Sequence, residues 1–113
     1  AFVSKCFLPG MIEKDYGSIV NVNSPAGWTS FGGATAYMAT RWALRGLSEA
    51  MRADVHGTRV LIQEIIIGET ESEYFKNNMG SNERIPAVGR LAGVISPRTA
   101  AEGIAYTIQT GKP

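Results

Sequence analysis

The sequence predicts an α/β fold built on a parallel sheet, and three observations carry this prediction. Two short apolar segments rich in β-branched residues, 18–23 and 60–67, are typical of strands. Helical patterns precede, separate and follow them, which gives the order helix, strand, helix, strand, helix. Strands that alternate with helices favour a parallel sheet. The 113 residues, 44% of them hydrophobic, suffice for the core of one domain.

Residues 1–12 are expected to form the end of an amphipathic helix, because apolar residues recur there at helical spacing. These residues are Phe2, Val3, Cys6 and Phe7. A Pro-Gly pair at 9–10 ends the pattern, and Cys6 is expected to be an inert thiol of the core. A turn at 15–17 leads into the first strand. Residues 24–34, rich in Gly, Ser, Pro and Thr, then form a loop.

A long helix is expected from about residue 35 to residue 55. Its apolar residues recur every three or four positions: Met38, Trp42, Leu44, Leu47 and Met51. Gly57 can supply the left-handed conformation that follows a helix end. The strand 60–67 is nearly continuous in apolar residues, which suits a strand covered on both faces. Within it, Glu64 is either a functional carboxylate or, as we favour, a side chain exposed at an edge or strand end.

Residues 68–95 are expected to form a loop that contains a short helix at about 71–78. Ser96 and Pro97 then open the last helix. A serine side chain caps the first free backbone N–H groups, and proline suits the first helical position. The apolar pattern of this helix continues to Gly111.

Charge and composition exclude several functions. Eleven basic and ten acidic residues leave a net charge of +1, which gives no electrostatic reason to expect nucleic acid or an anionic membrane as a partner. A single cysteine excludes an internal disulfide, and no Cys/His cluster exists to hold a metal. No apolar run approaches the roughly 20 residues that span a bilayer. We therefore expect a cytoplasmic protein.

Three polar residues form a candidate reaction centre. Ser24 begins the loop after the first strand, Tyr37 lies near the start of the long helix, and Arg41 follows one helical turn later. Residues four apart share a helix face, so a guanidinium can lie beside the phenol. A fixed cation favours phenolate, and a serine hydroxyl at a strand end can reach the same point. Such a set can polarise a carbonyl oxygen and give it a proton. The alternative is an amphipathic helix with a surface ion.

Longer motifs around these residues resemble a known family. The sequence GSIVNVNSPAG occupies 17–27, and YMATRWALRGLSEAMR occupies 37–52. They resemble the short-chain dehydrogenase/reductase family, whose members read G-x-I-V-N-x-S-S-x-A-G and then, at the same serine-to-tyrosine spacing, Y-x-x-x-K and A-L-x-G-L/F-x-E-x-L-R. The resemblance extends from about residue 7 to residue 112 and keeps the order and spacing of several motifs.

The resemblance implies a role for each residue that matches a motif. Ser24 matches the serine that hydrogen-bonds the substrate oxygen, and Tyr37 matches the general acid/base. Arg41 stands where the family has the lysine that binds the nicotinamide ribose and assists the tyrosine. Gly68 and Ser72 match the glycine and threonine of P-G-x-x-x-T, a segment that flanks the nicotinamide, although isoleucine replaces its proline. Tyr37, Arg41, Gly68 and Ser72 are thus the implied cofactor-binding residues.

The implied fold is a partial, Rossmann-like, doubly wound parallel sheet, with residues 1–113 as one partial domain. The family's Gly-rich phosphate loop, T-G-x-x-x-G-x-G, is absent. The chain is therefore expected to begin in the helix before the family's fifth strand and to lack the N-terminal nucleotide-binding half and the last strand. Because residues that distinguish the two cofactors lie in that half, NAD and NADP stay open.

The implied activity is interconversion of a small-molecule alcohol and a carbonyl compound with NAD or NADP. A homo-oligomer formed through the helix 35–55 is expected, with Met38, Trp42 and Met51 facing the partner copy. Residues 69–95 resemble the family's substrate lid, and three of them are candidates to line a pocket: Tyr74, Phe75 and Met79. The alternative function is a non-catalytic fragment or pseudoenzyme that acts as an oligomerisation or interaction module.

Overall fold

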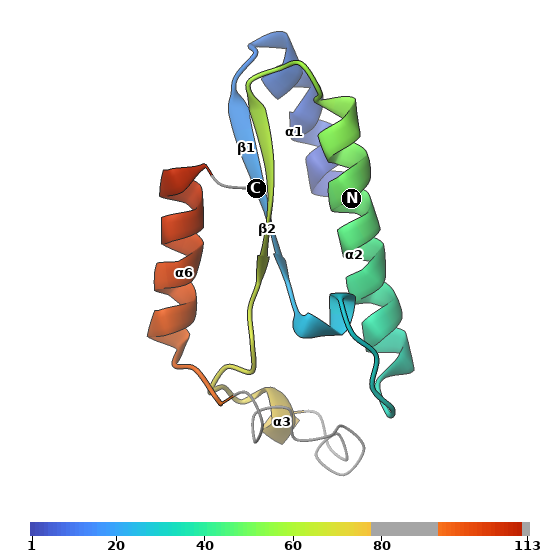
Figure 1. Ribbon diagram of the computed structural model, residues 1–113, viewed down its shortest axis with the longest axis vertical. Helices are drawn as coiled ribbons and strands as arrows, with labels where there is room; N and C mark the ends of the chain where they lie inside the picture. The colour runs from blue at the N-terminus through green and yellow to red at the C-terminus, as the bar shows by residue number, and fades with distance from the viewer. Residues whose placement is uncertain (78–92, 112–113) are drawn as a thin grey trace.

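The computed structural model describes residues 1–77 and 93–111 (Figure 1). Two parallel strands form the sheet, with helices on both of its faces, which confirms the predicted α/β class. On one face lie α1 (Phe2–Glu13) and α2 (Thr35–Asp54), and on the other lies α6 (Pro97–Thr110). The remaining elements are β1 (Gly17–Asn23), β2 (Val60–Ile66), the short 3₁₀ helix η1 (Pro25–Gly27) and the single turn α3 (Tyr74–Asn77).

The strands run in register from Gly17 opposite Val60 to Asn23 opposite Ile66. Their carboxyl ends are therefore adjacent, and the Ile67 N–H extends the pairing by donating to the Asn23 carbonyl at 3.0 Å. Helix α2 connects the two strands as a crossover, the connection that parallel pairing requires. The segments that follow β1 and β2 therefore both leave the sheet from the same edge.

The core lies between α2 and the sheet. Met51 of α2 and Val55, the residue that follows this helix, pack on Val60 and Ile62 of β2, and each of the four is at most 6% exposed. Full burial of a side chain of this size contributes roughly 1.5–3 kcal/mol. Met51, 4% exposed, is thus part of this core, and the expectation that it faces a partner copy is wrong.

Helix α1 forms as expected, but its buried face differs from the predicted one. The partly buried residues are Leu8 and Met11, which pack on the core, whereas Phe2 and Phe7 are 79% and 62% exposed and Cys6 is also exposed. The predicted core position of Cys6 is wrong. The helix also continues through Pro9 to Glu13, because the core contacts at positions 8 and 11 hold the backbone on both sides of the proline.

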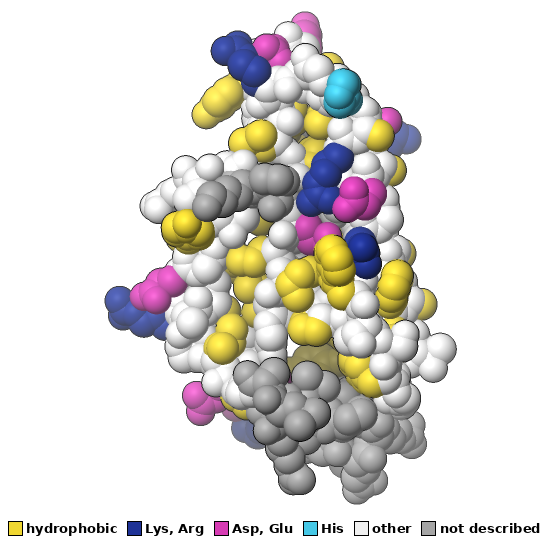
Figure 2. All heavy atoms as spheres, viewed as in Figure 1, with side chains coloured by type: hydrophobic (Ala, Val, Ile, Leu, Met, Phe, Trp, Pro, Cys, Tyr) yellow, Lys and Arg dark blue, Asp and Glu magenta, His cyan; other side chains and the backbone are white. Residues whose placement is uncertain are grey.

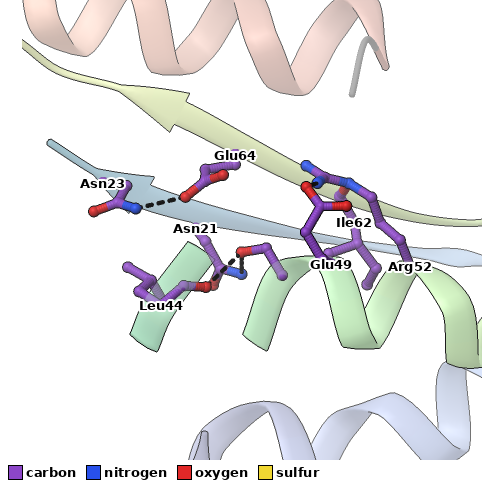
Figure 3. Close-up of polar contacts among 8 residues, drawn as sticks. Asn21, Asn23, Leu44, Glu49, Arg52, Ile62 and Glu64 are labelled. Carbon is purple, nitrogen blue, oxygen red and sulfur yellow. Dashed lines mark hydrogen bonds and ion pairs between the residues drawn. The ribbon is translucent and has the colours of Figure 1, made fainter. Parts of the chain in front are cut away.

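Polar contacts attach α2 and α6 to the strands. On the α2 side, the Arg52 Nε donates to the Ile62 carbonyl at 2.9 Å and Nη1 pairs with Glu49 at 2.6 Å (Figure 3). Figure 2 shows basic and acidic side chains together over this seam. On the α6 side, the buried Gln63 donates from Nε2 to the Thr107 carbonyl at 2.6 Å.

The predicted ends of α6 are confirmed. The Ser96 Oγ accepts a hydrogen bond from the Thr99 N–H at 3.1 Å, and Pro97 is the first helical residue. Gly111 closes the helix with a φ of +63°, a conformation that glycine adopts without strain.

The turns at the far end of the sheet are joined by Asp15 and Arg59. The Asp15 carboxylate accepts from the backbone N–H of Arg59 at 2.7 Å and from its Nε at 2.9 Å. These two hydrogen bonds hold the pKa of Asp15 below its ordinary value. Across the described part of the chain, no helix has both the length and the apolar character needed to cross a membrane.

Candidate functional site

A cleft of about 360 Å³ opens at the carboxyl ends of the two strands. Its walls come from the ends of β1 and β2, from η1 and the loop after it, and from the first turns of α2. All five predicted site residues line it: Ser24, Tyr37, Arg41, Gly68 and Ser72. Ligands of parallel sheets bind at this edge, because the loops that follow the strands converge there.

Ser24 reaches the cleft because β1 ends directly before it. Its backbone is extended, with φ −134° and ψ 157°, and it caps η1 by accepting the Ala26 N–H on Oγ at 3.3 Å. Pro25 follows at the first position of η1, where its missing N–H costs nothing. Since Oγ acts as the acceptor in this cap, its own hydrogen is available for donation to an oxygen in the cleft.

Tyr37 and Arg41 lie on one face of α2, as their spacing predicted. The guanidinium carbon of Arg41 is 4.9 Å from the centroid of the Tyr37 ring. Arg41 Nη1 donates to the carbonyl of Val22 at 3.3 Å, which draws the cation toward the end of β1. Within the described part of the chain, Arg41 Nε is buried without a hydrogen-bond partner. A buried and unpaired N–H is costly, so this atom is a donor suited to an oxygen of a bound molecule.

Gly68 and Ser72 lie where the chain leaves β2. No heavy atom comes within 4 Å of the point where a Cβ of Gly68 would be, so its backbone is open to the cleft. The two ends of the lid-like segment 69–95 are joined, because the Ile95 N–H donates to the Glu69 carbonyl and the Glu71 N–H donates to the Ile95 carbonyl, each at 2.9 Å.

Part of the lid prediction can be compared with the structure. The short helix expected at 71–78 is found at Tyr74–Asn77. Tyr74 lines the cleft, as expected. The Phe75 side chain and Met79 lie outside the described residues.

Two polar residues near the cleft were not predicted as site residues. Asn23, the last residue of β1, lines the cleft and is only 2% exposed. Its Nδ2 donates to Glu64 Oε1 at 2.6 Å (Figure 3). Glu64 lies on an edge strand of the two-stranded sheet, as the favoured expectation had it, but its side chain is half-buried rather than exposed. The available signal for Asn23 was its place at a carboxyl strand end, but sequence spacing does not indicate that the side chain of Glu64 reaches it from β2.

The cleft is lined by both hydrogen-bond donors and apolar side chains. Ser24 and Tyr37, which carry hydroxyls, and Arg41, which carries a guanidinium, line the same space as Val22 and Phe31. Among residues 1–77 and 93–111, no three His, Cys, Asp or Glu side chains gather as a metal site requires. Such donors can bind an oxygen atom and exchange a proton with it.

A family model and the similar proteins found by sequence are all described as dehydrogenases. The family model described as short chain dehydrogenase matches residues 1–83. The NADP-dependent 3-hydroxy acid dehydrogenase YdfG of Escherichia coli is 35% identical over 88 residues, which cover 74% of this chain and 36% of the relative. An NADP-dependent 3-hydroxy acid dehydrogenase of Schizosaccharomyces pombe is 29% identical over 107 residues, which cover 94% of this chain and 41% of that protein.

A solved structure titled the closed form of serine dehydrogenase complexed with NADP+ matches with a TM-score of 0.74 and 27% identity. The match covers 92% of this chain and 43% of that one. The chain therefore spans about two fifths of the length of the relatives it matches. Because the family model matches well over half of the chain, and the Escherichia coli relative is 35% identical across most of it, the chain belongs to the short chain dehydrogenase family.

Proposed function

We propose that the protein is an NADP-dependent oxidoreductase that interconverts a small alcohol and the corresponding carbonyl compound. The observation that carries the proposal is the meeting of Ser24, Tyr37 and Arg41 in one cleft at the strand ends. The cleft is lined by the segment after β1, by α2 and by the segment after β2, which are separate along the chain. The alternative, an amphipathic helix with a surface ion, does not account for a cleft that Ser24 shares with Tyr37 and Arg41.

In this proposal each residue acts on the substrate oxygen or on its neighbour. The Ser24 hydroxyl donates to the carbonyl oxygen and holds it, while Tyr37 gives that oxygen its proton during reduction and takes it back during oxidation. Arg41, over the Tyr37 ring, stabilises the negative charge that the phenol acquires when it has given up the proton. When bound, the nicotinamide cofactor would supply a hydride as NADPH in the reduction and accept one as NADP+ in the oxidation.

The residues present fit such a cofactor. The unpaired Nε of Arg41 is a donor for a ribose hydroxyl, and the open backbone at Gly68 and the Ser72 hydroxyl lie in the same cleft. The dehydrogenase relatives named above are NADP-dependent, and the matched serine dehydrogenase is complexed with NADP+, which favours NADP over NAD. A cytoplasmic location remains a prediction.

Titration of the whole protein with NADPH tests the proposal. We expect saturable binding that is tighter for NADPH than for NADH. The substrate panel pairs 3-hydroxy acids and serine, offered with NADP+, with the corresponding carbonyl compounds, offered with NADPH, and we expect turnover of at least one pair. Arg41→Ala should weaken NADPH binding roughly tenfold, because a hydrogen bond from a charged group is lost. Arg98→Ala, on the exposed face of α6, is the matched control. Absence of NADPH binding would contradict the proposal, and binding without turnover would favour the non-catalytic alternative.

The exposed face of α2 supports a homo-oligomer as part of this function. Small residues follow that face at helical spacing, and all are exposed: Ala36, Ala39, Ala43, Gly46 and Ala50. Beside it, a groove between α1 and α2 is lined by apolar residues that include Leu8, Ile12 and Leu47. Such small residues allow a second helix to approach closely, and the exposed Phe2 and Phe7 of α1 add apolar area.

Ala43→Arg is expected to convert the oligomer to monomer, because a long charged side chain prevents a close approach of two α2 helices. Light scattering after gel filtration measures the mass in solution. Ala101→Arg, on exposed α6, is the matched control and should leave the mass unchanged. An oligomer of unchanged mass in Ala43→Arg would exclude α2 as the interface.

A further inference from the structure

We infer that Asn23, oriented by Glu64, is the positioning residue of this site: it sets where Ser24 lies relative to the α2 turn that carries Tyr37 and Arg41. The inference rests on the proposed function for its kinetic consequences. Asn23 lies at the end of β1, directly before Ser24, and is 2% exposed.

The Asn23 side chain contacts each segment that carries a site residue. Its Oδ1 accepts from the Ser24 N–H at 2.9 Å, and its Nδ2 donates to the Arg41 carbonyl at 3.1 Å. The same Nδ2 donates to Glu64 Oε1 at 2.6 Å. Its backbone carbonyl accepts from the N–H of Ile67, the residue before Gly68. One residue therefore links the serine loop, helix α2 and the end of β2.

Glu64 determines which way the Asn23 amide points. An amide has two N–H donors on one side and a carbonyl acceptor on the other. The Glu64 carboxylate and the Arg41 carbonyl are both acceptors, so the NH₂ group must face them. The reverse orientation would bring Oδ1 against both oxygens in a buried place, where unpaired polar groups are costly. Oδ1 is then held toward the Ser24 N–H. Figure 3 shows the contact from Asn23 Nδ2 to Glu64.

Gly27 leaves the space that this arrangement needs. A Cβ at Gly27 would lie 2.6 Å from Asn23 Nδ2 and 3.0 Å from the Arg41 carbonyl oxygen. The loop after Ser24 is therefore packed directly on the Asn23–Arg41 hydrogen bond. Movement of the serine loop relative to α2 would have to break that bond.

A second set of buried hydrogen bonds on the same face of the sheet serves as a comparison for the contacts of Asn23. Asn21 Nδ2 donates to Ser48 Oγ at 2.9 Å, and Ser48 Oγ donates to the Leu44 carbonyl at 2.9 Å. Ser48 is fully buried, so this is another buried link between β1 and α2. It lies farther from the cleft, and neither Asn21 nor Ser48 lines the cleft. A variant at Ser48 therefore removes a comparable buried contact without touching the site.

The kinetic test is made in the whole protein with NADPH and the best carbonyl substrate of the panel. Asn23→Asp removes the donor to Arg41 and sets two carboxylates against each other. We expect kcat to fall roughly 100-fold, the effect of misplacing reacting groups, with KM for NADPH changed less than about twofold. Ser48→Ala should lower Tm and leave kcat unchanged.

The double variant Asn23→Asp/Glu64→Gln separates positioning from stability. A glutamine at 64 can donate to an aspartate at 23, which restores the link to β2 but not the hydrogen bond to Arg41. We expect Tm to recover toward the native value while kcat stays low. Recovery of kcat together with Tm, or an equal loss of kcat in Ser48→Ala, would show a stability effect only and overturn the inference.

Amide hydrogen exchange supplies a readout that does not depend on activity. Asn23→Ala removes the acceptor of the Ser24 N–H, and we expect that N–H to exchange roughly tenfold faster or more, because its hydrogen bond is lost. In Ser48→Ala, the Ser24 N–H should exchange at the native rate once the change in the free energy of global unfolding is taken into account. If the protein shows no dehydrogenase activity, the proposed function fails and exchange still decides the inference. Unchanged Ser24 exchange in Asn23→Ala would refute it.

Discussion

Tyr37→Phe is expected to lower kcat/KM roughly 10²- to 10⁴-fold, the range attributed to a positioned general acid/base. The variant keeps the aromatic ring beneath Arg41 and removes only the hydroxyl that exchanges the proton. NADPH affinity should therefore change little, so that the loss appears in turnover. Steady-state kinetics with NADPH, together with a binding titration, measure the two effects separately.

The matched control is Tyr16→Phe, which removes the same hydroxyl from a side chain that is 77% exposed and lies outside the cleft. It should keep full activity. A Tyr37→Phe enzyme that turned over at the native rate would exclude Tyr37 as the acid/base, even if NADPH still bound.

Gly27→Ala is expected to destabilise the fold by about 1–3 kcal/mol, the usual cost of inserting a methyl group into a packed place. The new Cβ would lie 2.6 Å from Asn23 Nδ2 and 3.0 Å from the Arg41 carbonyl. The Arg41 carbonyl belongs to the backbone of α2 and cannot move aside, so the loop or the Asn23 amide must shift. Urea unfolding gives the free energy, and kcat should fall with the displaced serine.

Gly103→Ala is the control for this change. Its Cβ would meet Ile65 Cδ1 of β2 at 3.6 Å, an ordinary van der Waals contact between α6 and the sheet. Alanine is a better helix former than glycine by up to about 1 kcal/mol, so this variant should be more stable than the native chain. Equal stability of Gly27→Ala and the native protein would show that the loop after Ser24 is not packed against α2 as described.

At position 41 this chain has arginine where the family pattern has lysine. Arg41 keeps a fixed positive charge beside Tyr37, and its fork of donors also reaches the Val22 carbonyl at the end of β1. Arginine is effectively never deprotonated, so in the proposed reaction it acts only as a charge and a donor, and Tyr37 must exchange its proton with another group.

The order of elements and the gathering of the site residues were predictable because they follow from local patterns and one topological rule. Alternating strands and helices require a parallel sheet, and parallel strands end at the same edge. Ser24 and Gly68 follow those two ends, while Tyr37 and Arg41 are related by the helical repeat, so their positions in one cleft required no knowledge of side-chain packing.

The remaining features depend on which surfaces meet after the chain has folded. Helix α1 is apolar on more than one side, and its spacing could not show that the sheet packs against Leu8 and Met11 while Phe2 and Phe7 stay exposed. The contact between Asn23 and Glu64 joins residues of two strands, and a difference of one residue in register would turn these side chains to opposite faces. Sequence patterns thus identified the candidate reacting groups, whereas tertiary packing supplied the buried amide that we propose orients them.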